Sequence, residues 1–120
     1  MTKVLRDQDV TVVELDAEYD SFDMLRLQQV HDLLVALAQT VTPPRLVLDL
    51  RQTRFLGSAF LEMVFRAWKR LQERQGAFAL CCLQPYCAEV IKATRLDHLW
   101  PSYATREEAV RALAENAASP

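Results

Sequence analysis

Two short apolar runs, separated by one long amphipathic segment, constrain the fold of this chain more than any other feature. The runs occupy residues 46–50 and 77–83 and are nearly continuous in apolar side chains. Such runs are typical of strands that are buried on both faces and have parallel neighbours. Residues 59–74 lie between the runs and have the length and periodicity of a crossover helix. The pattern therefore predicts an α/β fold in which helices pack on a sheet through right-handed crossovers.

The N-terminal third of the chain adds a hairpin and a helix to this unit. The β-branched run at residues 10–15 predicts a strand, and we expect residues 4–6 to pair with it across a tight turn. Apolar side chains then recur every three or four positions over residues 27–41, which predicts a helix capped by Asp20 or Ser21. Two consecutive prolines follow the helix and end it, because proline cannot continue a helix.

The C-terminal third continues the alternation of strands and helices. We expect Gly76 to stop the central helix as a residue that readily takes a positive φ angle. A shorter helix opens at Pro85 and ends near Leu96. Residues 98–100 are then expected to form an edge strand, with a half-exposed tryptophan. Residues 105–108 have the pattern of a capping box, which predicts the start of a final helix.

The composition limits what this domain can bind. Its 120 residues fit one domain, which we expect to span residues 1–116 with a short tail at 117–120. The net charge of −2 argues against direct nucleic-acid binding, which needs a strong basic excess. No apolar run reaches the roughly 18–20 residues of a membrane span, and the N-terminus carries no apolar signal region. We therefore expect a cytoplasmic protein without a membrane span.

The residues needed for metal binding or catalysis are few and scattered. Cys81, Cys82 and Cys87 are odd in number, and adjacent cysteines on a strand point to opposite faces, so we expect three reduced thiols, at least one of them buried. His31 and His98 have no metal-ligand spacing to these cysteines and no evident approach to a nucleophile. The sequence therefore predicts no metal, no cofactor and no catalytic residue.

The junction between the first apolar run and the central helix is the strongest candidate for a site. Gly57 and Ser58 lie at this junction. In open α/β folds, sites gather where the C-termini of strands meet the N-termini of helices. Ser58 is placed to be either the N-cap or a first-turn residue of the helix. It is not a nucleophile elbow, because positions 56 and 60 are Leu56 and Phe60, not glycines.

The central helix is expected to have a core face and a solvent face. The core face consists of apolar residues at helical spacing: Phe60, Leu61, Val64, Ala67, Trp68 and Leu71. The solvent face consists of mainly polar and charged residues: Ser58, Glu62, Lys69 and Glu73, with Arg66 beside them. We expect Phe65 at the boundary of the two faces and Met63 at the far margin. Mixed charge beside an exposed aromatic fits a protein-docking surface, although a merely solvated helix face has the same pattern.

These features together resemble the STAS domain, the family of bacterial anti-sigma factor antagonists. The resemblance covers about residues 4–113. It rests on the apolar strand ending in Asp49, on the motif at residues 55–58, on the amphipathic helix with Gly76 after it, and on the helix and turn at residues 88–97. It implies a STAS-like mixed β-sheet of four to five strands with about four helices packed on it.

The resemblance implies a protein-binding regulatory module that acts in signalling and transcription regulation. Ser58 matches the family's phosphorylatable serine, and Asp49 matches its acidic residue at the strand end. The implied partner is a histidine-kinase-like anti-sigma factor that phosphorylates the serine, whereas the unphosphorylated domain binds it and frees a sigma factor. The partner-binding residues that the resemblance implies are Asp49, Gly57, Ser58, Glu62, Phe65, Arg66 and Lys69.

The chain departs from the family pattern beside this serine. Gly57 stands where the family usually has an aspartate, and Phe60 stands where it often has a glycine. Loss of the aspartate removes a charge next to the phosphate acceptor, so the binding role follows from the resemblance more directly than phosphorylation does. The alternative is a constitutive docking or scaffold domain of the same fold, in which Ser58 only caps the helix. A small enzyme is the third and weakest interpretation.

Overall fold

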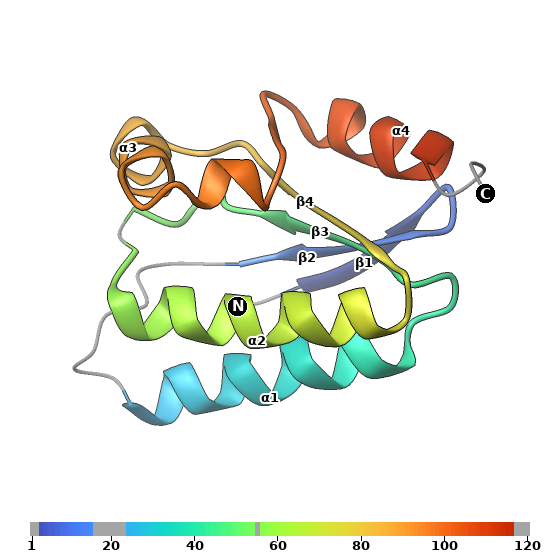
Figure 1. The fold of residues 1–120 in the computed structure, drawn as a ribbon, viewed down its shortest axis with the longest axis horizontal. Helices are drawn as coiled ribbons and strands as arrows, with labels where there is room; N and C mark the ends of the chain where they lie inside the picture. Colours follow the sequence, from blue (N-terminus) through green and yellow to red (C-terminus); the bar gives the residue numbers. More distant parts are fainter. Residues whose placement is uncertain (1–2, 16–23, 55, 117–120) are drawn as a thin grey trace.

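The computed structural model describes residues 3–15, 24–54 and 56–116, and in it a five-stranded sheet lies between helices (Figure 1). The described elements in chain order are β1 (Lys3–Asp7), β2 (Val10–Glu14), α1 (Met24–Thr40), β3 (Arg45–Asp49), α2 (Ser58–Glu73), β4 (Ala77–Cys81), α3 (Pro85–Ala93), a 3-10 helix (Leu96–His98), β5 (Ser102–Tyr103) and α4 (Arg106–Asn116). The predicted caps at Asp20 and Ser21 and the predicted tail at 117–120 lie outside the described residues.

The sheet has the mixed topology that the sequence predicts. The spatial order of the strands follows their order in the chain. β1 and β2 form the expected antiparallel hairpin, in which Val4 lies opposite Val13. The pairs β2–β3, β3–β4 and β4–β5 are all parallel. The parallel strands therefore end at one edge of the sheet, where the loop from β3 leads to Ser58, the first residue of α2.

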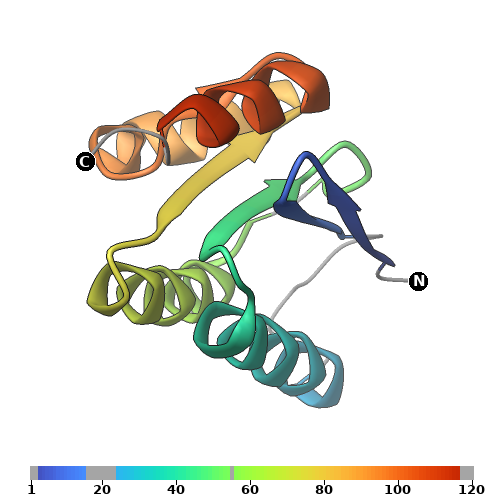
Figure 2. The same cartoon turned by 90° about the vertical axis from the view of Figure 1, so that its right-hand side faces the viewer.

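Helices cover both faces of the sheet, as Figure 2 shows. α1 and α2 pack side by side under one face, and α4 packs on the other. Side chains alternate along β3, so Leu46 and Leu48 enter the larger core beneath α1 and α2, whereas Val47 enters the smaller core under α4. This explains the uninterrupted apolar run, because both faces of the strand are buried. Among the described residues, no helix combines the length and hydropathy that crossing a membrane requires.

Gly76 ends α2 for a different reason from the one predicted. The positive φ angle, 56°, belongs to Gln75, and no described glycine has one. Gly76 is instead required for space, because a Cβ atom there would lie 2.4 Å from the carbonyl oxygen of Pro44. The amide of Gly76 also donates a hydrogen bond to the carbonyl of Leu71 at 2.8 Å. The glycine therefore permits a close approach between two loops, not a left-handed turn.

The prediction of an edge strand at residues 98–100 is wrong. Leu96–His98 form a 3-10 helix that follows Arg95 in a left-handed conformation, and the edge strand is β5. Trp100 is only 1% exposed, not half-exposed, and its ring meets that of Phe78 edge-on with the centroids 5.8 Å apart. The turn carries the indole into the larger core, which the local pattern of residues 98–100 did not reveal.

Two further side chains differ from the expectations. Met63 is buried, because α1 packs against the side of α2 where a helical wheel places a margin. β4 ends at Cys81, because Cys82 has a φ angle of 60° and leaves the strand. Cys81 and Cys82 therefore do not point to opposite faces of a strand, and their sulfur atoms lie close together.

Candidate functional site

Ser58 is the exposed first residue of α2. Gly57 is the N-cap, with an extended backbone at φ −93° and ψ 168° and no side chain that could cap the helix. The sequence allowed Ser58 to be either the N-cap or a first-turn residue, and in the structure it is a first-turn residue. Among the described residues, no hydrogen-bond partner contacts the hydroxyl of Ser58. The hydroxyl therefore faces solvent at the positive end of the helix dipole.

The loop that leads to Ser58 is fixed by the segment around the start of α3. The amide of Leu50 donates to the carbonyl of Cys81 at 3.0 Å. The side chain of Gln84 donates to the carbonyl of Arg51 at 2.6 Å, and the thiol of Cys87 donates to the carbonyl of Thr53 at 3.3 Å. These contacts anchor the first half of the loop, so that α2 starts from a defined position.

Asp49 lies apart from this exposed surface, although the resemblance places it among the partner-binding residues. Its side chain is fully buried and accepts a hydrogen bond from the amide of Arg51 at 3.0 Å. Arg106, the first residue of α4, donates to the other carboxylate oxygen through Nε at 3.0 Å and Nη2 at 2.7 Å. Arg106 also pairs with Glu14 on β2. Arg106 therefore joins α4 to β3 through Asp49 and to β2 through Glu14.

This contact, which sequence reasoning missed, stabilises the charged form of Arg106. Burial disfavours the charged guanidinium, but the hydrogen bonds from Arg106 to Asp49 and Glu14 outweigh burial and raise the pKa of Arg106 above its ordinary value. The only signals in the sequence were an aspartate at the end of a buried strand and an arginine at a helix start. Neither signal identifies the other residue as its partner, because 57 positions separate the two.

Asp49, Cys81 and Cys82 form the one group of metal-ligand type among the described residues. Each offers a ligand atom, and these atoms lie within 4.8 Å of one another. The carboxylate is already engaged by Arg106, and Arg51 donates to the sulfur of Cys82 at 3.6 Å. Burial raises the pKa of the Cys81 thiol well above its ordinary value, and the charge of Asp49 raises it further. A cation would have to displace two guanidinium groups and ionise a buried thiol, so the group fits a metal poorly.

The other predicted docking residues lie along α2, which runs from Ser58 beneath the sheet. Glu62, Phe65, Arg66 and Lys69 are exposed, and Gly57 is half-buried. The ring of Phe65 is 36% exposed and packs against Trp68, with the centroids 5.3 Å apart. This places a large apolar side chain at the edge of a charged helix face.

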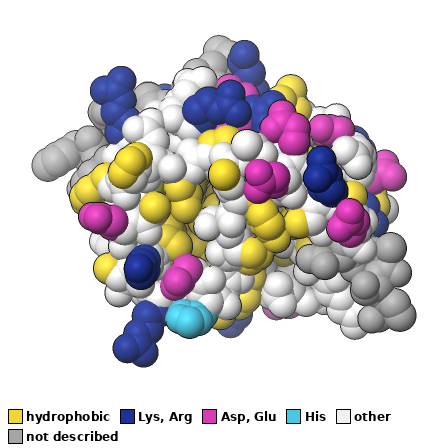
Figure 3. Space-filling view, turned by 90° about the horizontal axis from the view of Figure 1, so that it is seen from above, with side chains coloured by type: hydrophobic (Ala, Val, Ile, Leu, Met, Phe, Trp, Pro, Cys, Tyr) yellow, Lys and Arg dark blue, Asp and Glu magenta, His cyan; other side chains and the backbone are white. Residues whose placement is uncertain are grey.

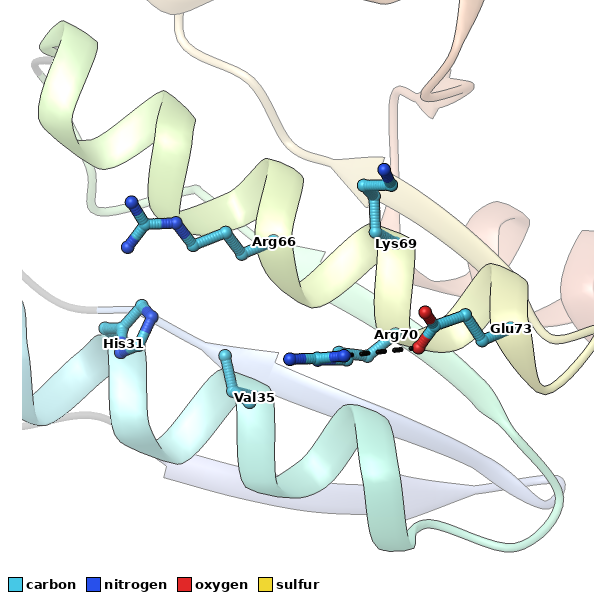
Figure 4. A pocket seen from close by; sticks show the side chains of 6 residues that line it. All are labelled: His31, Val35, Arg66, Lys69, Arg70 and Glu73. Atoms are coloured by element: carbon cyan, nitrogen blue, oxygen red, sulfur yellow. Dashed lines mark hydrogen bonds and ion pairs between the residues drawn. The ribbon is translucent and has the colours of Figure 1, made fainter.

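A groove between α1 and α2 adjoins this helix face. One part, of about 280 Å³, is lined by His31, Val35, Arg66, Lys69, Arg70 and Glu73 (Figure 4). A second part, of about 170 Å³, is lined by Leu27, Gln28, His31, Ala59, Glu62, Met63 and Arg66. The two parts share His31 and Arg66. Sequence reasoning named Arg66 and Lys69 but not the groove, because the groove exists only where two separate helices pack together.

The side of the molecule that carries α3 and α4 has a different character. Figure 3 shows positive and negative side chains interspersed there, with apolar atoms between them. Neither sign of charge dominates this view. The groove is the more distinctive surface, because three cations and one carboxylate line its larger part.

Comparisons with known proteins give the family. The STAS domain model matches residues 2–109. The chain is similar to a solved STAS protein described as an anti-sigma factor antagonist from Planctomyces limnophilus, with 33% identity, a TM-score of 0.81 and coverage of 94% of this chain and 97% of that one. A solved anti-sigma factor antagonist from Mycobacterium paratuberculosis is 30% identical, with a TM-score of 0.77 and coverage of 94% and 92%.

A curated relative gives a shorter match. BtrV of Bordetella bronchiseptica, a protein provisionally named as an anti-sigma factor antagonist, is 35% identical over 68 residues. The match spans 57% of this chain and 59% of the length of BtrV. The family model, by contrast, covers nearly all of the described elements, and the mixed sheet with its four α-helices is the fold that the similar solved structures share. The chain therefore belongs to the STAS domain family.

Proposed function

We propose that this domain is an anti-sigma factor antagonist that docks a histidine-kinase-like anti-sigma factor at the start of α2 and is switched by phosphorylation of Ser58. The observation that carries the proposal is the position of Ser58, an exposed first residue of α2 whose hydroxyl has no partner among the described residues. The names of the similar proteins support the regulatory role. Binding an anti-sigma factor would place the domain in the cytoplasm.

The helix start suits a phosphate chemically. In the transfer, the oxygen of Ser58 forms a bond to the γ-phosphorus of the partner's ATP, the bond to ADP breaks, and a base of the partner takes the hydroxyl proton. The product carries about −1.5 to −2 charges at neutral pH. Backbone amides and the helix dipole at the N-terminus of α2 stabilise such a charge. The domain can therefore accept the phosphate without unfolding, and the added charge acts on the docked partner instead.

The docking surface extends from Ser58 along the exposed face of α2. Phe65 supplies an aromatic side chain that a partner can bury, and Arg66 and Lys69 supply charges around it. Asp49 contributes indirectly in this proposal, because its pairing with Arg106 fixes the strand end from which the loop to Ser58 departs.

An enzymatic role has less support. The family's named members are regulators. In the described part of the chain, no hydrogen bond joins Ser58 to a histidine, and the ring of His31 is engaged with Asp32 at 3.2 Å. A serine nucleophile needs a base within hydrogen-bond reach.

One observation favours a constitutive dock as the second candidate. Gly57 takes the place of the family's usual aspartate, although its φ angle of −93° is open to any residue. The backbone therefore does not require glycine here, and the chain lacks the charge that the family pattern places beside the serine. A domain that docks its partner permanently has no need of that charge.

A paired pull-down with ATP present, read by mass spectrometry, separates the two candidates. The baits are the wild-type domain, Ser58→Asp and Ser58→Ala. The proposal expects the wild type to capture an anti-sigma factor and gain one phosphate at Ser58, Ser58→Ala to capture it without phosphate, and Ser58→Asp to lose it. Equal capture by all three baits without any phosphate would identify a constitutive dock. Failure of every bait to capture an anti-sigma factor would refute both candidates.

A further inference from the structure

The groove between α1 and α2 is lined on its α2 side by residues that extend from one end of the helix to the other. Ala59 lines the smaller part and Glu73 lines the larger part. At 1.5 Å per residue, these positions lie about 21 Å apart along the helix. Ala59 directly follows Ser58, so one end of the groove adjoins the proposed phosphorylation site. The groove is therefore an elongated surface that is continuous with the docking face.

The larger part of the groove is basic although the whole chain is slightly acidic. The net charge of the chain is −2, yet Arg66, Lys69 and Arg70 line the larger part against the single carboxylate of Glu73. Figure 4 shows Arg70 over the space between the helices and Lys69 projecting from the outer side of α2. Arg66 and Lys69 have no ion-pair partner among the described residues. These two charges are therefore available to an incoming anion.

The other charged side chains near the groove do not cancel the positive charge of its larger part. Arg70 pairs with Glu73 at 3.4 Å, but both side chains are at least half-exposed, and such a pair holds weakly. On the α1 side, Asp32 is engaged by hydrogen bonds from His31 and Gln28, which lower the pKa of its carboxyl group. Glu62 lies toward the Ser58 end. The positive charge is therefore concentrated in the half of the groove remote from Ser58.

We propose that this groove binds an acidic segment of the anti-sigma factor, with carboxylates of the segment reaching Arg66, Lys69 and Arg70. The inference rests on the proposed function, because it names the chemistry by which the partner is held. Arg66 lies one helical turn from both Lys69 and Arg70, so carboxylates one turn apart on a partner helix match their spacing. Val35, which is half-buried, lines the larger part beside these charges and offers an apolar contact, whereas Leu27 and Met63 line the smaller part and belong mainly to the core.

A helical segment fits this geometry better than a small free anion does. The cations occupy one turn of α2 at the rim of an open groove, whose lining also includes the apolar side chain of Val35. A single phosphate would contact the cations but would leave the apolar lining uncovered. A helix that carries acidic and apolar side chains along one face would use both features.

The inference also explains how phosphorylation of Ser58 opposes binding. A phosphate at the end of the groove adds about −1.5 to −2 charges next to Glu62. An acidic segment lying along the groove then meets repulsion at one end while it is attracted at the other. Because screening in physiological salt acts over about 8 Å, the repulsion affects the part of the segment that passes Ser58.

The first probe is a hexaglutamate peptide, and its binding is measured by ¹H–¹⁵N NMR of the whole domain. In low salt, the peptide is expected to shift amide resonances of residues 59–73 and of α1 beside them, and the affinity is expected to fall in high salt. The double variant Arg66→Glu/Lys69→Glu is expected to weaken this binding roughly tenfold. The control Lys92→Glu/Arg111→Glu, which reverses two other exposed cations, is expected to change it by no more than about twofold. Thermal unfolding of both variants shows that they remain folded.

Other outcomes overturn the inference. Shifts spread evenly over the surface, or equal losses in the two double variants, would mean that hexaglutamate responds only to net charge. Inorganic phosphate, titrated in parallel, would identify a small-anion site if it bound these residues as tightly as the peptide.

The anti-sigma factor is the second probe. Equal binding of this partner to the wild type and to Arg66→Glu/Lys69→Glu overturns the inference and leaves the proposed function standing. Conversely, if hexaglutamate binds at the groove but the wild type captures no anti-sigma factor, the proposed function fails while recognition of acidic segments is supported.

Discussion

Helix α2 begins with an exposed serine whose hydroxyl has no partner in the described structure, whereas helix α4 begins with an arginine that is paired with two carboxylates. The residues before these two helices differ as well. Gly57 caps α2 without a side chain, but Thr105 precedes α4 and accepts a hydrogen bond from the amide of Glu108 at 3.1 Å. Both helices pack on the same sheet, from opposite faces.

The contrast shows which helix start the fold depends on. The start of α4 is tied to β2 and β3 through charges that are largely withdrawn from water. Among the described residues, no ion pair involves the start of α2, and the helix is held by its apolar face against the core. The protein can therefore change the charge at Ser58 without losing an interaction that stabilises the fold. The proposed switch at Ser58 requires this freedom.

The largest effect is expected at the start of α4. Arg106→Met leaves the buried carboxylate of Asp49 without its main partner, which should cost about 3 kcal/mol of unfolding free energy, measured by urea denaturation. Adding Asp49→Asn to Arg106→Met should recover part of the loss, because the unpaired charge is then removed. If Arg106→Met were as stable as the wild type, the start of α4 would not be the structural contact that the comparison makes it.

The next effect concerns binding at α2. Phe65→Ala should weaken the anti-sigma factor complex by at least about 1 kcal/mol, as titration calorimetry would show, because an exposed aromatic is a typical interface anchor. The cost in domain stability should stay below about 1.5 kcal/mol, since the ring mainly loses its contact with Trp68. Leu99→Ala, which truncates an exposed apolar side chain outside α2, is the control and should leave binding unchanged. A large fall in Tm for Phe65→Ala would instead make Phe65 a core residue.

Removing the N-cap of α4 should have a moderate effect on the stability of the domain. Thr105→Ala removes the hydroxyl that accepts the amide of Glu108 and should destabilise the domain by about 1 kcal/mol in the same denaturation experiment. Thr105→Ser keeps the hydroxyl and should remain close to the wild type. Equal losses in the two variants would show that the methyl group of Thr105, not the cap, supplies the stability.

The matching change at α2 should have almost no effect on stability. Ser58→Ala removes a hydroxyl without a described partner, so its unfolding free energy should stay within about 0.5 kcal/mol of the wild type. If the proposed kinase-like partner phosphorylates Ser58, the only expected loss is the uptake of phosphate from labelled ATP in the presence of that partner. A loss as large as that of Thr105→Ala would remove the contrast between the two helix starts.

The smallest effect is expected when the family's aspartate is restored. Gly57→Asp should stabilise the domain by a few tenths of a kcal/mol, because the extended backbone at Gly57 suits an N-cap whose carboxylate accepts helix amides. If the missing aspartate limits phosphorylation, the same variant should take up phosphate faster than the wild type does. Unchanged phosphate uptake would mean that Gly57 is neutral for the switch.

Local patterns were sufficient to predict much of the fold. The β1–β2 hairpin, the two doubly buried strands and α2 could be recognised because hydrophobic periodicity reports on each segment by itself. The exposed position of Ser58 followed in the same way, from a glycine and a serine between a strand and a helix. Five of the residues expected to dock a partner, from Ser58 to Lys69, lie on the exposed side of α2 for this reason.

The errors arose where a side chain meets a distant segment. Met63 is buried by α1, Trp100 is carried into the core by a turn, and Gly76 is needed because Pro44 approaches it. The ion pair of Asp49 with Arg106 and the basic groove between α1 and α2 are of the same kind. A periodic pattern in one segment carries no information about which other segment will pack against it.

The sequence by itself thus determined the type and order of most elements, the two doubly buried strands, and the serine at the start of α2. These properties depend on hydrophobic spacing and helix-terminal residues within a few positions of one another. Tertiary structure alone decided that Asp49 is bound inside the protein by Arg106 and that Arg66, Lys69 and Arg70 border a groove beside α1. The physical reason is that these contacts join residues of different elements, and they exist only after packing has brought those elements together.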